Sequence, residues 1–555
     1  MSRGYSPLRA ELAVVGAGAA GLYTALCAAR AGARVTLVCA TPLEPSTAGA
    51  GRGVGSSTYW AQGGLAAAIS DEDSPERHLA DTLAAGRGAG RPSAARVLCE
   101  EAPRAIEDLA SLGMRFDTDE RGELELGLEG GHSTRRIVHA GGAATGQRLI
   151  HRLSALVAAH VNITVLERMR VAALLVADGR CQGVRLEDGR TVAAGATVLA
   201  TGGAAALWAR TTNPPEALGS GLLLALAAGA RLADLELVQF HPTAVAAADG
   251  ADGLLVTEAI RGEGARLLDP RGQRFVNELA PRDEVALAVQ RQLAHSGTGA
   301  VSLDMRHIDP GRFPTVVEAL CAAGIDPRHQ LVPVAPAAHY VMGGIATDLD
   351  GRASLPGLYA VGECSCTGLH GANRLASNSL TECIVFGARA ARAALAGADV
   401  EPAAGDPPAL AAGARAEAED AVRPEAGVRV SGDAGLGVGM DPRVGVETDP
   451  AAGIRAETRA EIEDAMPSDP GLMRPSDASR AALWRNAGLE RDAQGLRTLL
   501  SDPHPLLRLI AACALTRTES RGAHRRRDFP ELDSRFDGVH VTVGRQQTPR
   551  LEHWS

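Results

Sequence analysis

The stretch GLEGGHSTRRIVHAGGAATG (127–146) surrounds a single carboxylate, Glu129, with two histidines and two arginines. A fixed negative charge in such cationic surroundings could recognise a positively charged group on a substrate. It could equally balance Arg135 and Arg136 on a solvated loop. Since the stretch alone leaves both interpretations open, residues elsewhere in the chain must decide between them.

Four further cationic residues occur in separate segments that glycine and proline punctuate. They are His241 in QFHPT, Arg282 in LAPRD, His339 in AAHYVMGG and Arg374 in GLHGANRLASNSL. Each of these side chains, taken singly, is more often structural than functional. A function for them therefore depends on whether the fold gathers them at one place.

A glycine motif near the N-terminus provides the first element of such a fold. Residues 11–40 alternate as strand, glycine turn, helix and strand, and Gly16, Gly18 and Gly21 form G-x-G-x-x-G directly after the apolar run LAVV. Glycines in this context let the backbone turn sharply and approach a pyrophosphate at the positive end of the helix. The motif predicts dinucleotide binding, although the ribose-binding acid expected after the second strand is missing, because that strand ends in Cys39.

Three later segments also end in glycine-containing turns. They are SSTYWAQGGLAAA (56–68), ATVLATGGAAA (196–206) and LPGLYAVGEC (355–364). Each could be an ordinary turn between a strand and a helix. Their number and spread favour parallel strands of a doubly wound sheet whose carboxyl ends share one extended cofactor.

Changes in pattern along the chain indicate domain boundaries. We expect an α/β fold with a discontinuous Rossmann-like cofactor domain, an inserted α+β capping domain that would exclude water, and a C-terminal helical bundle. The expected boundaries are 1–240 and 339–398 for the two parts of the cofactor domain, 241–338 for the capping domain, 399–452 for a flexible linker rich in Ala, Gly, Pro and Asp, and 453–555 for the bundle.

Composition excludes several classes of function. All 56 basic residues are arginines, so lysine Schiff-base chemistry and a standard P-loop are absent. A net charge of −10 argues against nucleic acid as the main partner. Nine scattered cysteines fit reduced thiols in a cytosol, without a pattern for a metal or an iron–sulfur cluster, and no apolar run has the length of a membrane span.

The motifs FHPT, TEAIRGEGA, PRD, HY-MGG and HGANR-ASNSL occur in the order found in the succinate dehydrogenase and fumarate reductase flavoprotein family. Together with the glycine turns they make the chain resemble this family along nearly its whole length, and most closely the branch that oxidises L-aspartate. The resemblance implies a bound FAD, a capping domain and a C4 dicarboxylate held against flavin N5.

The resemblance also assigns roles to individual residues. The substrate ligands would be His241, Thr257, His339 and Arg374, because arginine and histidine donors suit carboxylates. Arg282 would be the proton-transfer arginine, with Glu258 and Arg261 as its relay, although a free guanidinium is ordinarily never a base. The FAD ligands would be Gly16, Ala17, Gly18, Ala19, Gly21, Ser57, Thr58, Gln62, Gly63, Gly64, Gly202, Glu363, Ser379 and Leu380. No metal site is implied.

Two features choose among members of the family. Ser57 stands where membrane-complex members carry a histidine that bonds to FAD, so we expect noncovalent FAD. Glu129 lies in a pattern, EGGHS-RRI-H, that resembles the aspartate-oxidising branch, and it is our candidate partner for the substrate amino group. An unpaired buried carboxylate is costly, so succinate should bind worse than aspartate.

The expected reaction is oxidation of L-aspartate to iminoaspartate, with reoxidation of the flavin by oxygen or fumarate. The product would feed quinolinate and NAD synthesis, and quinolinate synthase is a plausible functional partner. The alternatives are the flavoprotein subunit of a fumarate reductase or succinate dehydrogenase, and a flavin-binding scaffold without turnover. The scaffold alternative is motivated by Cys39, Ala143, Leu218 and Ser220, which depart from the family pattern near the expected FAD.

Overall fold

The computed structural model describes residues 7–43, 55–247, 252–397, 467–545 and 548–555. The chain opens with a parallel β–α–β unit made of β1 (Leu8–Val15), α1 (Ala19–Arg30) and β2 (Val35–Val38). Gly16, between β1 and α1, has a φ of 111°, and a Cβ on it would lie 2.2 Å from the carbonyl oxygen of Ala200. A Cβ on Gly21 would lie 1.9 Å from the carbonyl oxygen of Gly16, so both glycines are required for the helix to pack this closely.

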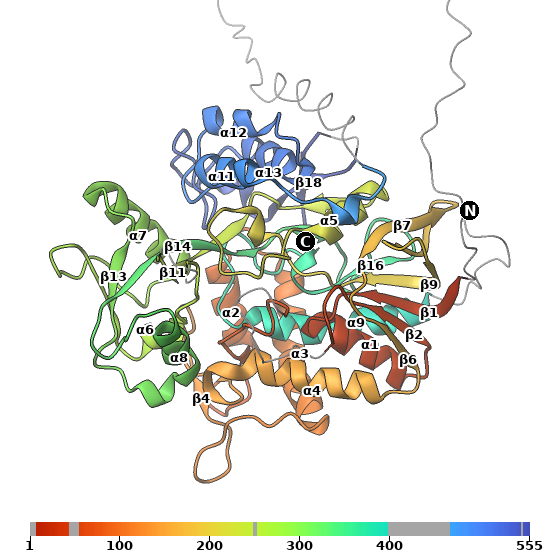
Figure 1. The fold of residues 1–555 in the computed structure, drawn as a ribbon, viewed down its shortest axis with the longest axis horizontal. Helices are drawn as coiled ribbons and strands as arrows, with labels where there is room; N and C mark the ends of the chain where they lie inside the picture. Colours follow the sequence, from red (N-terminus) through yellow and green to blue (C-terminus); the bar gives the residue numbers. More distant parts are fainter. Residues whose placement is uncertain (1–6, 44–54, 248–251, 398–466, 546–547) are drawn as a thin grey trace, which may run out of the picture.

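The main sheet has the strand order β6-β2-β1-β9-β8-β7, with β16 paired to the end of β9 (Figure 1). The further strands are β6 (Ile163–Leu166), β7 (Val171–Ala177), β8 (Arg180–Leu186), β9 (Thr191–Leu199) and β16 (Leu358–Ala360). The pairs from β6 through β2 and β1 to β9, and the β9–β16 pair, are parallel. The carboxyl ends of these strands therefore meet at one edge, although β16 is distant from β9 in sequence.

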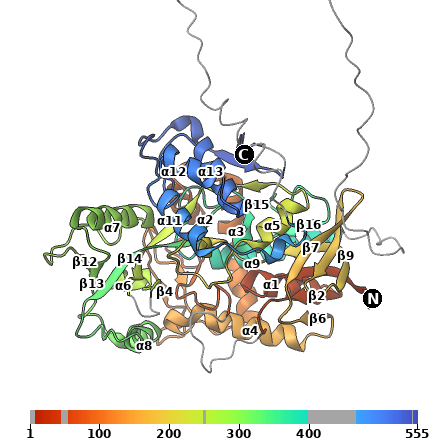
Figure 2. The ribbon, with the colours of Figure 1, turned by 45° about the horizontal axis from the view of Figure 1, so that its top comes forward.

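The capping segment forms a separate lobe, green in Figures 1 and 2. Its sheet has the order β11-β14-β13-β12 and is antiparallel. The elements are β11 (Val238–Val245), α6 (Glu258–Gly262), β12 (Arg266–Leu268), α7 (Arg282–Ser296), β13 (Val301–Asp304), α8 (Pro314–Ala322) and β14 (Val332–Val341). Most of their apolar residues form a core of their own, while Val238, Phe240 and Val341 pack into a core shared with the main sheet.

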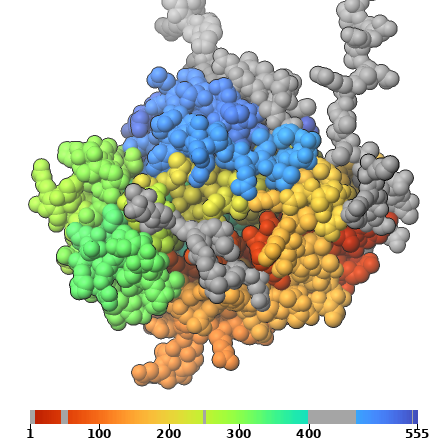
Figure 3. Space-filling view, viewed as in Figure 1, coloured from red at the N-terminus to blue at the C-terminus, as the bar shows by residue number. Residues whose placement is uncertain are grey.

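The C-terminal segment contains α11 (Asp477–Asn486), α12 (Ala493–Leu499) and α13 (Pro505–Thr516), and it covers the yellow part of the main domain in Figure 3. It also supplies two strands, which the expectation of a helical bundle did not include. They are β18 (Val539–Val543) and β19 (Arg550–His553), in a sheet of order β17-β15-β10-β18-β19 with β10 (Leu232–Ala233), β15 (Gly344–Ala346) and β17 (Ser365–Cys366). The C-terminal segment is thus built into the sheet system of the main domain.

Residues 519–526 of the C-terminal segment ESRGAHRRRDFPELD (519–533) are mostly buried, whereas residues 527–532 are exposed. Arg517 and Arg521 are fully buried and both bond to Glu519, while Arg517 also bonds to Glu236 at 2.8 Å. Arg526 is buried and pairs with Asp528. Carboxylates inside the fold, invisible to a local reading of the charges, compensate these cations.

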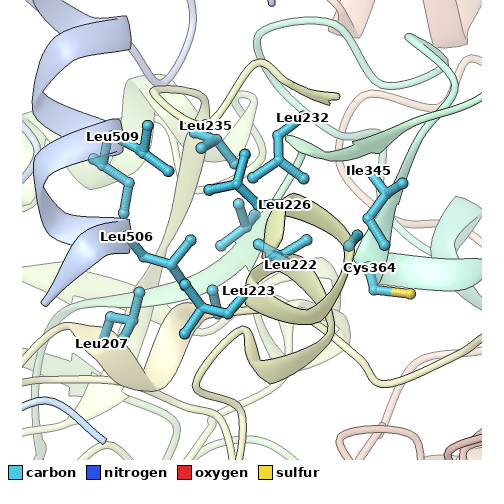
Figure 4. Packing of buried hydrophobic residues seen from close by; sticks show 14 of the residues in the cluster. Leu207, Leu222, Leu223, Leu226, Leu232, Leu235, Ile345, Cys364, Leu506 and Leu509 are labelled. Carbon is cyan, nitrogen blue, oxygen red and sulfur yellow. The ribbon is translucent and has the colours of Figure 1, made fainter. Parts of the chain in front are cut away.

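Alternate residues of the main sheet face two different cores. Leu12 and Val14 of β1 pack with the face covered by α1, α4 (Thr145–Ala159), α3 (Pro92–Ser111) and α9 (Asn378–Ala396). Ala13 and Val15 face the opposite core, which α5 (Ser220–Ala227) and α13 complete. Figure 4 shows leucines of α5 and α13 packed together there. Two buried faces explain why the strands read as continuous apolar runs.

The remaining elements support the loops around the strand ends. These are α2 (Pro75–Ala85) and a small sheet of β3 (Leu65–Ala66), β5 (Ile137–Val138) and β4 (Leu126–Gly127). All nine cysteines are free thiols; Cys321 is exposed, Cys27 and Cys383 are half-buried, and the others are buried. Among the described residues, no helix is long and apolar enough to cross a membrane. The expected linker at 399–452, and 453–466 of the expected bundle, lie outside the described residues.

Candidate active site

A cavity of about 350 Å³ lies at the carboxyl ends of the parallel strands and extends to the capping lobe. It gathers almost every residue predicted from the sequence. Its lining includes Gly16, Ala17, Gly18, Ala19, Ser57, Thr58, Gln62, Gly63, Gly64, Glu129, Gly202, His241, Thr257, Glu258, Arg282, His339, Glu363, Arg374, Ser379 and Leu380. Two predicted residues do not line it: Gly21 packs against Gly16, and Arg261 lies behind Glu258.

One end of the cavity is formed by the glycine turn and the N-terminus of α1. Ala19, the first residue of α1, donates its backbone N–H to Thr58 Oγ1 at 3.3 Å. Ser57 also lines the cavity and donates to Asn213 Oδ1 at 2.7 Å. Partly positive helix ends and free backbone donors favour an anionic group here.

The residues that depart from the family pattern fall at different places. Cys39 and Ser220 line the cavity, as expected. Leu218 does not, because its side chain packs in the core beneath α5. Ala143 lines a second cavity, at the seam with the capping lobe. Neither Leu218 nor Ala143 therefore lines the cofactor cavity, although Ala217 and Ser220, close to Leu218 in the chain, do.

Two arginines share one anchor at the other end of the cavity. Gln239 Oε1, on β11, accepts from Arg282 at 3.2 Å and from Arg374 at 3.3 Å. The amide nitrogen of Gln239 donates to Asn373 Oδ1 and to the carbonyl oxygen of Arg374, which fixes the amide orientation. The two guanidinium groups are thus held close together despite their repulsion, which suits a ligand with two negative charges.

Arg282 also belongs to a buried chain of charges. Its Nε donates to Glu258 Oε2 at 2.7 Å, and Arg261 lies 3.4 Å from Glu258 Oε1. Burial opposes ionisation of Glu258, but Arg282 and Arg261 outweigh it and hold the pKa of this carboxyl below its ordinary value. Burial, with Arg282 nearby, lowers the pKa of Arg261.

The two histidines of the cavity face each other, with ring centroids 5.1 Å apart. Burial, reinforced by the nearby arginines, lowers the pKa of His241 and of His339 well below the usual histidine value, and His339 adds to the lowering for His241. Both are therefore neutral near pH 7. Because His241 Nδ1 accepts from the backbone N–H of Thr243 at 3.3 Å, its Nε2 carries the proton and can donate to a ligand.

Arg374 is stacked and desolvated. Its guanidinium lies over the ring of Tyr340 at 4.4 Å from the centroid, and its NH1 donates to Ser379 Oγ at 3.0 Å. Burial and the neighbouring Arg282 lower the pKa of Arg374 to about 10. Burial raises the pKa of Glu363 to about 7. An anion bound beside Arg374, or a cation bound beside Glu363, would therefore stabilise the charged form of that side chain.

Glu129 is buried, with 6% of its surface exposed, and lines the cavity from the loop after β4. Ser377 Oγ donates to Glu129 Oε2 at 2.7 Å. Among the described residues, no arginine comes within ion-pair distance of this carboxylate. Arg136 instead pairs with Asp73 and Asp81. The alternative in which Glu129 balances Arg135 and Arg136 on a solvated loop was therefore wrong.

Three residues that contribute to the cavity were not predicted from the sequence. Gln239, Tyr340 and Ser377 all line or support the cavity and all lie within segments whose charged neighbours were singled out. Their polar but uncharged side chains gave no signal. The positive φ of Ser377, 59°, is a property of the folded backbone that residue types do not reveal.

Comparisons with known proteins agree with this geometry. Residues 11–380 match a family model described as FAD binding domain, and residues 500–553 match one described as fumarate reductase flavoprotein C-term. The chain is 43% identical to L-aspartate oxidase of Caulobacter vibrioides, over 94% of this chain and 93% of that protein. It is 40% identical to L-aspartate oxidase of Mycobacterium tuberculosis, with the same shares covered.

Solved structures give the same relationship at lower identity. E. coli quinol fumarate reductase aligns with a TM-score of 0.78 and 27% identity, over 99% of this chain and 97% of that one. Mycobacterium smegmatis Sdh1 aligns with a TM-score of 0.73 and 27% identity, over 99% and 94% of the two chains.

Proposed function

The chain belongs to the L-aspartate oxidase family of FAD-binding proteins, and on this premise we propose that it oxidises L-aspartate to iminoaspartate by the site chemistry set out below. The observation that carries the proposal is the buried carboxylate of Glu129 in a cavity otherwise rich in arginine and histidine donors. A dicarboxylate that also bears an ammonium group matches both charges.

The residues of the cavity fit a bound FAD. Gly16 to Ala19 and the N-terminus of α1 offer a phosphate cradle. The buried oxygens Gln62 Oε1 and Thr201 Oγ1 have no hydrogen-bond partner among the described residues, so both can serve a ligand. FAD, when bound, supplies a hydride acceptor at N5. The serine at position 57 offers no imidazole for a covalent link, so FAD is held noncovalently.

Arg374, Arg282, His241, His339 and Thr257 hold the two substrate carboxylates. The arginines supply charge, and the neutral histidines supply directed N–H donors. Because Gln239 positions both guanidinium groups before the substrate arrives, little reorganisation is required on binding. A closed, desolvated cavity strengthens each of these interactions.

Glu129 binds the ammonium group of the substrate. Oxidation requires that the ammonium first lose one proton, after which the C2–H bond breaks, the hydride leaves with both electrons, and the C=N bond of the iminium forms. Glu129, as the carboxylate beside the amine, accepts the proton. Succinate lacks the cation and would leave Glu129 buried without a charge partner, which disfavours its binding.

Arg282 has a more limited role in the aspartate direction. A guanidinium is a poor base, so Arg282 orients the substrate and stabilises its charge. In fumarate reduction, the chain Arg282–Glu258–Arg261 would deliver a proton to the substrate. Reoxidation by fumarate or oxygen completes the cycle, and the product enters quinolinate and NAD synthesis.

We further propose that the enzyme acts in the cytoplasm and couples functionally to quinolinate synthase. Nine free thiols support a reducing compartment. A second candidate, the flavoprotein subunit of a fumarate reductase or succinate dehydrogenase, is favoured by the alignment with E. coli quinol fumarate reductase.

Purification from a FAD-supplemented expression and assay under air separate the candidates. A yellow protein that consumes oxygen with L-aspartate, without added iron–sulfur protein, supports the oxidase. Turnover of succinate alone, dependent on such a partner, supports the second candidate. A colourless protein that cannot be reconstituted with FAD would favour a scaffold without turnover.

A further inference from the structure

A second cavity, of about 430 Å³, lies at the seam between the main domain and the capping lobe. The loop that carries Glu129 forms one wall, and residues of α6 and its neighbours, Ala259 and Gly262 among them, form the opposite wall. None of the functions above makes use of this space.

Three side chains separate this second cavity from the cofactor cavity. Gln62, Glu129 and Thr257 line both. The same carboxylate that faces the substrate position is therefore also reached from the seam. The two cavities are therefore neighbours, and the three side chains that they share are polar.

Two leucines from opposite sides of the seam are exposed beside the second cavity. Leu128 of the main domain is 44% exposed and Leu279 of the capping lobe is 53% exposed, and both line the cavity. Between them, Gly130 approaches the lobe so closely that a Cβ on it would lie 2.3 Å from Glu258 Oε1. The seam is thus tightly packed at Gly130 and open beside it.

A bound dinucleotide fills much of the first cavity, so the substrate needs a route that does not require its release. We propose that the second cavity is the passage by which dicarboxylates enter and leave the active site, with Glu129, Gln62 and Thr257 at its inner end. The proposal rests on the proposed function for the identity of the ligand. Arg135 and His139, which line the cavity, are cations suited to a passing carboxylate.

A bulky side chain that obstructs a passage changes the binding kinetics in a way that a damaged binding site does not. It slows association and dissociation by the same factor and leaves the equilibrium constant unchanged. Gly262 is a suitable position, because it lines the cavity, its φ is ordinary, and a Cβ on it would point across the seam to the carbonyl oxygen of Leu128 at 3.6 Å.

The experiment is stopped-flow binding of malonate, a dicarboxylate that cannot be dehydrogenated, to the FAD-loaded protein, followed by flavin absorbance. In Gly262→Trp we expect both rate constants to fall at least tenfold, with Kd within twofold of wild type. The matched control is Gly299→Trp, also in the lobe, where a Cβ would meet nothing within 4 Å. It should bind malonate like wild type. Widening the mouth by Leu128→Ala with Leu279→Ala should raise both rates.

Unchanged rates in Gly262→Trp would overturn the passage, as would a weakened Kd with a normal association rate. Unchanged rates in the double alanine variant would also count against it, and they decide the matter if Gly262→Trp does not fold. If the FAD-loaded wild type neither binds malonate nor is reduced by L-aspartate, the dicarboxylate function is wrong and the passage has no ligand to carry. If it is reduced by L-aspartate but binds no malonate, the same comparison of rates is made with anaerobic L-aspartate, followed by flavin bleaching. Normal malonate binding with unaffected variants leaves the function intact and removes only the passage.

Discussion

Ser377 donates a hydrogen bond of 2.7 Å to Glu129 from a backbone position whose φ is 59°. The same hydroxyl accepts from the backbone N–H of Gly64 at 3.2 Å. A side chain in the left-handed region costs about 1 kcal/mol or more, so glycine would be the relaxed choice here. Serine stands at this position at a conformational cost, and its hydroxyl holds the carboxylate that faces the substrate.

Ser377→Gly should therefore separate stability from specificity. The variant relieves the backbone but releases Glu129, so we expect an unchanged or higher Tm and a preference for aspartate over succinate reduced about tenfold, as for loss of one hydrogen bond to a charged group. Ser377→Ala should lose the same preference and also some stability. Steady-state kcat/KM for both substrates, with thermal unfolding, checks this. An unchanged preference in both variants would show that Ser377 does not position Glu129.

Gln239 offers a second test, because one amide oxygen anchors Arg282 and Arg374. Gln239→Leu keeps the volume and removes the anchor, so kcat/KM for aspartate should fall by about 10- to 100-fold while FAD content stays normal. Gln292→Leu, on α7 of the same lobe, is the matched control, since its side chain lines neither cavity. Wild-type kinetics in Gln239→Leu would mean that the arginines are positioned without it.

The residues that line the cavity could be predicted from the sequence more completely than the residues that hold them in place. Gly16, Arg282, His339 and Arg374 occur in motifs with characteristic spacing, so their gathering in one cavity followed from resemblance and from the rule that ligands bind at strand carboxyl ends. The anchors depend on tertiary contacts. Nothing near Gln239 in the sequence indicates that Arg282, 43 residues away, and Arg374, 135 residues away, both meet its amide oxygen.

Charged segments were the least predictable part of the fold. Arg136 and Arg517 both lie in strongly basic stretches that could be solvated, yet both are fully buried. Their partners, Asp73 for Arg136 and Glu236 for Arg517, are far away in sequence. Local charge patterns cannot reveal compensation that only the folded chain supplies.

Burial of His132 predicts a loss of stability in mild acid. Burial lowers its pKa to about 4, so between about 6.5 and about 4 the unfolded chain binds the proton that the folded chain refuses. The free energy of unfolding is therefore unaffected by this histidine above about pH 6.5. As the pH falls, protonation of His132 in the unfolded chain lowers it, by about 2 kcal/mol at pH 5. His78, whose pKa burial also lowers to about 4, acts in the same direction.

His132→Gln removes this titration but retains a side chain that can bond to the carbonyl oxygen of Ala376, which His132 contacts at 2.9 Å. Denaturant unfolding at pH 7.5 and pH 5 should give a smaller pH-dependent loss in the variant than in wild type. Equal losses in the two proteins would show that His132 is not a buried neutral group.

An anaerobic titration shows whether Glu129 recognises the substrate amino group. The FAD-loaded wild type, Glu129→Gln and the control Glu123→Gln, which neutralises an exposed carboxylate that lines neither cavity, are each titrated with L-aspartate and with succinate while flavin bleaching is followed. We expect aspartate to bleach wild type and the control in preference to succinate, and we expect Glu129→Gln to lose this preference. Retention of the full preference in Glu129→Gln would contradict this role of Glu129.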